Sequence, residues 1–411
     1  MLETVSITNY KSIASLKLNL GLVNVFIGEN GAGKSNILEA LTLAGAAQSA
    51  KLNNEFLVSR GVRITAPKMM RSAFNQADVN KPIKISVATT EGSEFGYKLN
   101  NDNKPYSTWT NSLSLNPRGA RSAIEGLVKA LLSHADNLPS PEKENLIERL
   151  ASQLTKAVEK HKAAGITAES HKELMEVELE LGDNAQFRVG VEANTIDQFV
   201  IYSPENSALR MFEREGQIEP LGINGEGLLK LLSVMSKDSN SVPIQSVKNA
   251  LKHFSWFEDF TIVDEEARSR MQIKDIFLDR LCNGFDQRSA NEGFLFLTFY
   301  FALFSSNLTP KFFAIDNVDA SLNPKLCQSM IEQLVNLAKA NGKQAILTTH
   351  NPAVLDGLNL RDNDQRLFVV SRDRLGKTKV RRFDKDLPTG LGSRMSELFL
   401  RGAIGGLPKG F

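Results

Sequence analysis

The chain has 411 residues, of which 42% are hydrophobic and 23% are charged. This composition excludes a disordered chain, a collagen-like chain and a disulfide scaffold, and the length allows two or three domains of roughly 150 residues each. With 49 lysines and arginines against 47 aspartates and glutamates, no large overall charge draws the protein onto nucleic acid, although a local basic face stays open.

The sequence also favours a soluble protein of a reducing compartment. The two cysteines, Cys282 and Cys327, have no metal-ligand spacing. The N-terminus lacks the basic leader and apolar core of a signal peptide, and the most apolar segment, 293–304, falls short of the roughly 20 residues that span a membrane. We therefore expect a cytoplasmic protein without a membrane contact.

Strands and one helix are predicted near the N-terminus. Alternating apolar residues over 5–10 and 16–20 predict an antiparallel pair of half-buried strands. The apolar run 22–27 predicts a buried strand, and the apolar residues of 37–43 predict a helix after a glycine-rich turn. Further strand-like segments lie within 83–100 and 174–203.

Between those strands the apolar spacing turns helical, from about residue 118 to 164. Ser140 followed by Pro141 is typical of a helix start. We predict a helical hairpin inserted into a split core, either an ordinary sub-lobe or an arm that docks a partner. The expected divisions are an N-terminal part of the core at 1–103, the inserted lobe at 104–172 and a C-terminal part of the core at 173–411.

Beyond residue 240 the pattern predicts helices, ending in a buried helix over 293–304. A strand at 312–315, a helix at 324–341 and a strand at 345–349 follow. From residue 366 we expect one more strand and a charged, hairpin-like stretch.

Residues 28–35, GENGAGKS, match the pattern G-x-x-x-x-G-K-[ST] in full, between a predicted strand and a predicted helix. Glycines let the backbone turn so tightly that successive amides point at phosphate oxygens, and the helix N-terminus adds positive charge. The lysine of this pattern contacts the β- and γ-phosphates, and the serine hydroxyl ligates Mg²⁺. The motif predicts binding of ATP with Mg²⁺ by Gly28, Asn30, Gly31, Ala32, Gly33, Lys34, Ser35 and Asn36.

Two later strands end in polar residues that suit the second half of such a site. Asp316 follows the apolar run 312–315, so its carboxylate emerges at the carboxyl end of the strand, and we expect it to bind Mg²⁺ together with Ser35. His350 ends the apolar run 345–349. In this order along the chain, a sensor of the γ-phosphate is favoured over a structural histidine.

These motifs together resemble an ABC-type ATPase head. The resemblance rests on the opening segment 7–41, on the strand at 312–315 with the following ASLNP, and on TTHNP at 348–352. It is to RecF, to SMC-like heads and above all to the OLD-like AAA ATPases of bacterial anti-phage systems, closely over 1–70 and 275–370. It implies an α/β, ABC-type P-loop core, a mixed sheet flanked by helices, with an inserted helical lobe.

In that group two heads enclose two nucleotides, and a signature motif of the opposite subunit completes each site. The candidate here is Asn291-Glu292-Gly293, where the family usually has serine in place of Asn291. The resemblance implies a homodimer or higher homo-oligomer in which Asn291 and Gly293 contact the nucleotide of a second copy. A simple helix cap is the alternative for Asn291.

One residue departs from the family pattern, which places a glutamate directly after the aspartate. Here that position is Asn317, and an amide cannot act as a general base. Losing a general base costs roughly 10²–10⁴ in rate. We predict slow hydrolysis with Asp319 or another acid as a substitute base; a dimer that rarely hydrolyses ATP is the alternative. The predicted catalytic residues are Lys34, Asp316, Asn317 and His350.

Two basic features stay open. Arg60 and Arg63 are expected to contact phosphate or DNA, or to lie on the surface in contact with solvent. The stretch 372–382 has its densest charge at Lys377, Lys379, Arg381 and Arg382, which suits a charged strand edge or a contact to a nucleic-acid backbone.

No nuclease motif is visible in the sequence. The resemblance therefore implies a sensor and scaffold subunit of a two-component anti-phage system, of Septu type or PARIS type, that controls a separate effector nuclease. The alternatives are a RecF-like DNA repair clamp, for which DNA is the partner, and a hydrolysis-dead nucleotide-binding interaction module.

Overall fold

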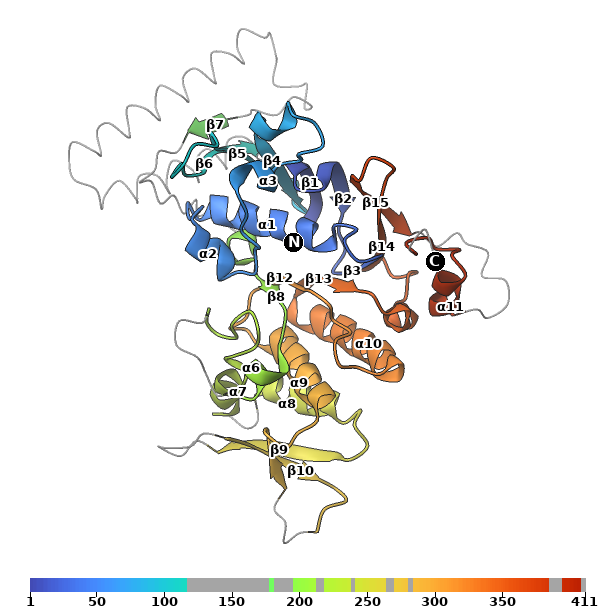
Figure 1. Ribbon diagram of the computed structural model, residues 1–411. Helices are drawn as coiled ribbons and strands as arrows, with labels where there is room; N and C mark the ends of the chain where they lie inside the picture. Colours follow the sequence, from blue (N-terminus) through green and yellow to red (C-terminus); the bar gives the residue numbers. More distant parts are fainter. Residues whose placement is uncertain are drawn as a thin grey trace, which may run out of the picture.

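The computed structural model describes residues 1–116, 177–180, 195–211, 218–237, 241–263, 270–279, 284–383 and 394–407. Two six-stranded sheets enclose a central helix, and a layer of helices covers the outer face of the second sheet (Figure 1). A small third sheet lies beyond those helices.

The second sheet is the parallel one and carries the glycine-rich loop. Its order is β15-β14-β3-β13-β12-β8, and all neighbours pair in parallel except β14 and β15. Every residue of β3, β12 and β13 is buried, because a parallel sheet covered on both faces needs continuous apolar strands. The strands are β3 (Val23–Ile27), β8 (Ile201–Tyr202), β12 (Phe312–Ile315), β13 (Gln344–Thr349), β14 (Gln365–Arg372) and β15 (Thr378–Phe383).

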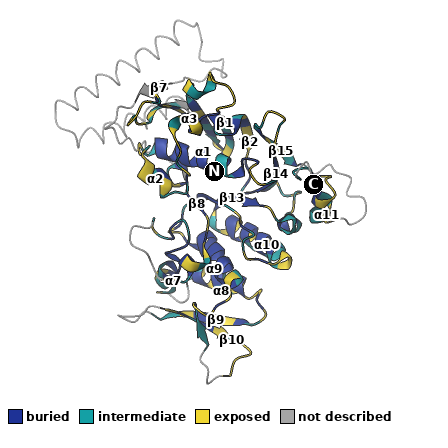
Figure 2. Ribbon diagram, viewed as in Figure 1, coloured by how far each residue is buried: buried dark blue, intermediate teal, exposed yellow. Residues whose placement is uncertain are grey.

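The first sheet is antiparallel, in the order β2-β1-β4-β5-β6-β7. Helix α1 (Lys34–Gln48) lies between the two sheets and is buried almost all round, as Figure 2 shows. Its Leu38 and Leu41 share one core with Ile85 of β4 and Phe26 of β3. The strands are β1 (Leu2–Tyr10), β2 (Ile13–Asn19), β4 (Ile83–Thr89), β5 (Glu94–Asn100), β6 (Thr110–Asn116) and β7 (Val177–Glu180).

A second core fills the space between the parallel sheet and the helical layer. Helix α9 (Glu292–Ser305) is its centre and is buried from Phe294 to Ser305. Around it lie α7 (Leu228–Ser236), α8 (Val242–Leu251) and α10 (Pro324–Asn341). The other helices of the described residues are α2 (Asn54–Val58), α3 (Pro67–Met70), η1 (Asp78–Asn80), η2 (Thr195–Gln198), α6 (Asn206–Leu209), η4 (Pro352–Gly357) and α11 (Met395–Leu400).

Most of the predicted elements are confirmed: the first strand pair, β3, α1, α9, β12, α10, β13 and the β14–β15 hairpin. The prediction of helices alone between 240 and 292 was wrong. There, β9 (Phe257–Val263), β10 (Arg270–Asp275) and β11 (Phe285–Asp286) form the third sheet. Its Phe257 and Trp256 pack on Phe294, a tertiary contact that apolar spacing does not encode.

Strand β6 extends the first sheet to Asn116, beyond the division expected after residue 103. Pairing with β5 outweighs the weak local signal of this segment. The predicted helical hairpin lies within 117–176, outside the described residues. Cys282 is also outside the described residues. Cys327 is buried, and burial raises the pKa of its thiol to about 12. Across the described ranges, no helix has both the length and the apolar character that a membrane crossing requires.

Candidate nucleotide-binding site

The loop between β3 and α1 depends on glycine at several positions. Gly31 and Gly33 have φ angles of 75° and 108°, the left-handed region that favours glycine. A Cβ on Gly28 would lie 2.0 Å from the carbonyl oxygen of Val370, so β14 packs directly on the loop. Helix α1 starts at Lys34, and no side chain caps its N-terminus. The backbone amides of its first turn can therefore donate hydrogen bonds to an anion.

The Lys34 ammonium is folded over this loop. Its Nζ donates to the carbonyl oxygens of Gly28 (2.8 Å) and Glu29 (3.1 Å) and lies 3.4 Å from His350 Nδ1. Burial lowers the pKa of Lys34 to about 8. Partial burial and the neighbouring Lys34 charge also lower the pKa of His350, which keeps its imidazole neutral at pH 7.

The low pKa of Lys34 predicts how ATP binding depends on pH. A triphosphate favours the charged ammonium, so binding above pH 8 has to take up a proton, and we expect ATP affinity to fall by about tenfold per pH unit above pH 8. Calorimetric titrations at pH 7, 8 and 9 in two buffers of different ionisation enthalpy measure both the affinity and the proton uptake. An affinity that stays constant from pH 7 to 9 would contradict this assignment.

The stability of the fold depends on pH in the opposite direction to ATP affinity. The folded pKa of Lys34 lies below its ordinary value of 10.5, so the unfolded chain binds this proton more tightly. Burial of Lys34 therefore lowers the stability of the fold below pH 8, and this loss is relieved as the pH rises from 8 towards 10.5.

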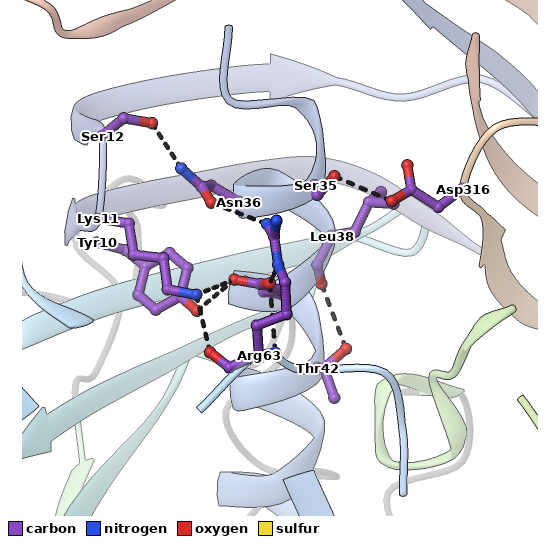
Figure 3. Close-up of polar contacts among 10 residues, drawn as sticks. Tyr10, Lys11, Ser12, Ser35, Asn36, Leu38, Thr42, Arg63 and Asp316 are labelled. Carbon is purple, nitrogen blue, oxygen red and sulfur yellow. Dashed lines mark hydrogen bonds and ion pairs between the residues drawn. The ribbon is translucent and has the colours of Figure 1, made fainter. Parts of the chain in front are cut away.

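Strands β12 and β13 place oxygen atoms beside the start of α1. Ser35 Oγ donates to Asp316 Oδ2 at 2.9 Å (Figure 3), and Thr348 Oγ1 donates to Asp316 Oδ1. The pairing of Ile315 with Leu347, and of Thr349 with Ile27, aligns the carboxyl ends of the three strands at one edge. A hydroxyl and a carboxylate at this distance are the hard oxygen ligands that Mg²⁺ takes, so these residues fit the ion.

The segment after Asp316 turns back towards β13. Asn317 has a φ of 57°, which asparagine tolerates better than most residues, and its backbone N–H donates to Thr348 Oγ1 at 2.9 Å. Asp319 Oδ1 accepts from Thr349 Oγ1 at 2.6 Å and from the His350 backbone N–H at 3.4 Å. Asp319 is thus attached to the strand that carries His350.

Asn291 and Gly293 lie elsewhere, at the N-terminus of α9. Asn291 Oδ1 accepts from the Phe294 backbone N–H at 2.8 Å, so this side chain caps the helix. Both residues border a pocket of about 710 Å³, to which residues 28–35 contribute nothing. The pocket is lined by His253, Phe254, Ser255, Trp256, Asn291, Glu292, Gly293, Ser321, Asn323, Lys325, Leu326 and Ser329.

Sequence reasoning missed three residues that brace the glycine-rich loop. Ser12 Oγ accepts from Asn36 Nδ2 at 2.7 Å, Thr378 Oγ1 donates to the Ala32 carbonyl at 2.9 Å, and Arg372 Nε donates to the Gly31 carbonyl at 2.7 Å. Only Arg372 carried a signal, as part of the basic stretch. That stretch is therefore joined to the loop at one end, whereas Lys379, 63% exposed, faces solvent.

The two arginines after α1 have different environments. Arg63 Nε donates to Glu39 at 2.6 Å, and its Nη2 lies 3.5 Å from Asn36 Oδ1. Arg60 instead stacks over the ring of Phe56, with 3.5 Å between its guanidinium carbon and the ring centroid. Of the pair, Arg63 is thus the one beside Asn36, a residue of the predicted nucleotide site.

Comparisons with known proteins agree with this geometry. Residues 23–356 match the family described as "AAA domain, putative AbiEii toxin, Type IV TA system". The chain is 30% identical over 146 residues to uncharacterized protein MJECL10 of Methanocaldococcus jannaschii, and 38% identical over 55 residues to the DNA replication and repair protein RecF of Lysinibacillus sphaericus. These alignments cover 34% and 13% of this chain, and 64% and 15% of the two relatives, less than two thirds of either.

Among solved structures, the crystal structure of an Smc head bound to the C-winged helix domain of ScpA is similar over 93% of this chain and 98% of that chain, with 12% identity and a TM-score of 0.51. At this identity the likeness concerns the fold alone. By the family match, the chain belongs to this AAA-domain family, and its fold is that of the Smc head.

Proposed function

We propose that this chain is a slow ATPase that binds ATP with Mg²⁺, closes as a homodimer around the nucleotides and thereby controls a separate effector nuclease in anti-phage defence. One observation supports the proposal that the chain binds ATP. The glycine-rich loop, Asp316 and His350 meet at one edge of the parallel sheet, with the Lys34 ammonium between the loop and His350.

Each side chain then has a role that its position supports. Lys34 and the uncapped amides of α1 hold phosphate oxygens by positive charge. Mg²⁺, when bound, neutralises charge on the phosphates. Thr348 orients the Asp316 carboxylate, and the neutral imidazole of His350 donates a hydrogen bond towards the γ-phosphate. Asn317 orients water through its amide but takes up no proton.

The homodimer is supported by the position of α9. Asn291 and Gly293 border a pocket separate from the loop, so one chain holds two different half-sites. A second copy facing the first with two-fold symmetry would bring the N-terminus of each α9 to the other copy's triphosphate. Two nucleotides then hold the copies together.

The test is the mass of the protein in solution, with and without ATP and Mg²⁺, for wild type and Gly293→Asp. An aspartate in the first turn of a helix favours the helix itself, but its charge repels a partner's γ-phosphate. We expect ATP to double the mass of wild type and not that of Gly293→Asp, while Gly293→Asp still binds ATP, with the lower affinity of a single copy. A wild-type mass that ATP leaves unchanged would refute the dimer.

The defence role rests on the resemblance to OLD-like ATPases and on the family description, which names a toxin of a type IV toxin–antitoxin system. Such a role requires a partner. The test is co-purification of this chain with the products of neighbouring genes, in ATP and without it. An adjacent nuclease that binds only one nucleotide state supports the proposal.

The second candidate is a DNA repair clamp, which the RecF match and the basic β14–β15 hairpin favour. It predicts ATP-dependent binding of duplex DNA, weakened by Lys379→Glu. Duplex binding without any nuclease partner would favour the clamp over the defence role.

A further inference from the structure

A buried carboxylate lies on α1, one turn after Ser35. Glu39 is 1% exposed and accepts hydrogen bonds from three side chains: Tyr10 Oη at 3.0 Å, Lys11 Nζ at 2.5 Å and Arg63 Nε at 2.6 Å. Figure 3 labels these three donors. The Arg63 backbone N–H adds a fourth contact at 3.4 Å. Three distant segments, the end of β1, α1 and the loop after α2, therefore meet at one side chain.

The two cations around Glu39 differ in exposure. The Lys11 side chain is 13% exposed, and its second bond is to the Arg63 carbonyl at 3.0 Å, so it is directed inward. The Arg63 side chain is 66% exposed although its Nε is held. One carboxylate between two cations leaves a net positive charge, and the outer one is the guanidinium.

The free side of this guanidinium faces the nucleotide site. Nε is bound to Glu39, and Nη2 lies beside Asn36, the residue that follows Ser35. Burial lowers the pKa of Arg63, but the hydrogen bond and charge of Glu39, with a smaller contribution from Asp316, outweigh it and raise the pKa above its ordinary value. A planar guanidinium fixed at Nε presents its remaining N–H groups in one direction.

We propose that Glu39 is a positioning residue: it holds Arg63 so that the outward N–H groups of the guanidinium meet the bound triphosphate beside Asn36. Tyr10 and Lys11 hold the Glu39 carboxylate in the core, so this carboxylate is a fixed anchor for the Arg63 guanidinium. An arginine side chain that is already ordered loses less rotamer freedom on binding than a free one. This inference rests on the proposed ATP site.

The alternative is that Glu39 only stabilises the fold, and a double-mutant cycle on the full chain separates the two roles. We would measure the dissociation constant for ATP with Mg²⁺ and the melting temperature of wild type, Glu39→Gln, Arg63→Ala and the double variant. If Glu39 acts through Arg63, each single change weakens ATP binding by about tenfold, and the double variant is no weaker than the singles. AMP, which lacks the outer phosphates, should bind all four alike.

Two further variants keep the test decisive. Glu39→Asp retains the charge but shortens its reach, so it should reproduce the loss of ATP affinity if Glu39→Gln does not fold. Asp259→Asn breaks the Lys248–Asp259 ion pair (2.8 Å) between α8 and β9 and should leave ATP affinity unchanged.

Two results would overturn the inference: losses of ATP affinity that add up in the double variant, or a lower melting temperature with unchanged affinity. Lys34→Met provides the reference. If wild type binds no ATP, or Lys34→Met binds it equally well, the proposed function fails. If Lys34→Met abolishes binding and Glu39→Gln does not change it, only the inference about Glu39 fails.

Discussion

Replacing Lys34 by methionine is expected to weaken ATP binding by about 100-fold or more. Hydrogen bonds from a charged group are worth about 1.5–3 kcal/mol each, and about 1.4 kcal/mol corresponds to a factor of ten. The Lys34 ammonium has two carbonyl partners in the loop and lies where the phosphates are expected. Methionine keeps most of the apolar stem of the side chain and removes the ammonium, with its charge and its hydrogen bonds. Calorimetry with ATP and Mg²⁺ measures the change.

Lys343 offers a matched control. It is 1% exposed, and burial lowers its pKa to about 8, as in Lys34. It precedes β13 at the amino end of the sheet, opposite the loop, and donates to the Thr309 carbonyl at 2.8 Å. Lys343→Met should lower the melting temperature and leave ATP affinity within about twofold, because its lost contacts are remote from the site. Equal losses of ATP affinity in the two variants would mean that Lys34 acts through the fold.

Asn317→Glu is expected to raise the rate of ATP hydrolysis by roughly 10–100-fold. A carboxylate at this position supplies a general base, which contributes about 10²–10⁴ in rate. The gain is expected at the lower end, because the φ of 57° suits asparagine and costs a glutamate about 1 kcal/mol. Phosphate release at saturating ATP measures the change.

Asn317→Gln is the matched control, since it has the length of glutamate without a base. If it gains as much as Asn317→Glu, the side chain acts by its length rather than by proton transfer. Asp319→Asn tests the other acid: a slow wild-type rate that this change abolishes identifies Asp319 as the substitute base. A rate that neither Asn317→Glu nor Asp319→Asn changes would contradict a base at either position.

Much of the candidate site could be predicted from the sequence because its signals are local. The glycines of the loop, the apolar strands and the polar residues that end them all lie within short segments, as with Asp316 after 312–315. Parallel strands carry their carboxyl ends to one edge, so those residues were expected to meet. The structure brings Ser35 and Asp316 within 2.9 Å of each other.

The braces of the loop could not be predicted in this way. Thr378 is 346 residues from Ala32 and has no local pattern to mark it. Glu39 reads as one more polar residue on a helix, but three segments that converge on it leave it buried. The β9 strand was missed because its burial follows the packing of Phe257 and Phe260 rather than strict alternation.

The sequence by itself determined the glycine-rich loop, the buried strands and helices beside it and the polar residues at their ends, because each depends on the order of residues over one turn or one strand. Only the tertiary structure decided the strand order around β3, the attachment of the basic hairpin to the loop through Arg372, and the cluster around Glu39. Those features depend on contacts between segments far apart in the chain. These contacts are stabilised by the burial and pairing of polar groups, and no local sequence pattern indicates which distant groups will pair.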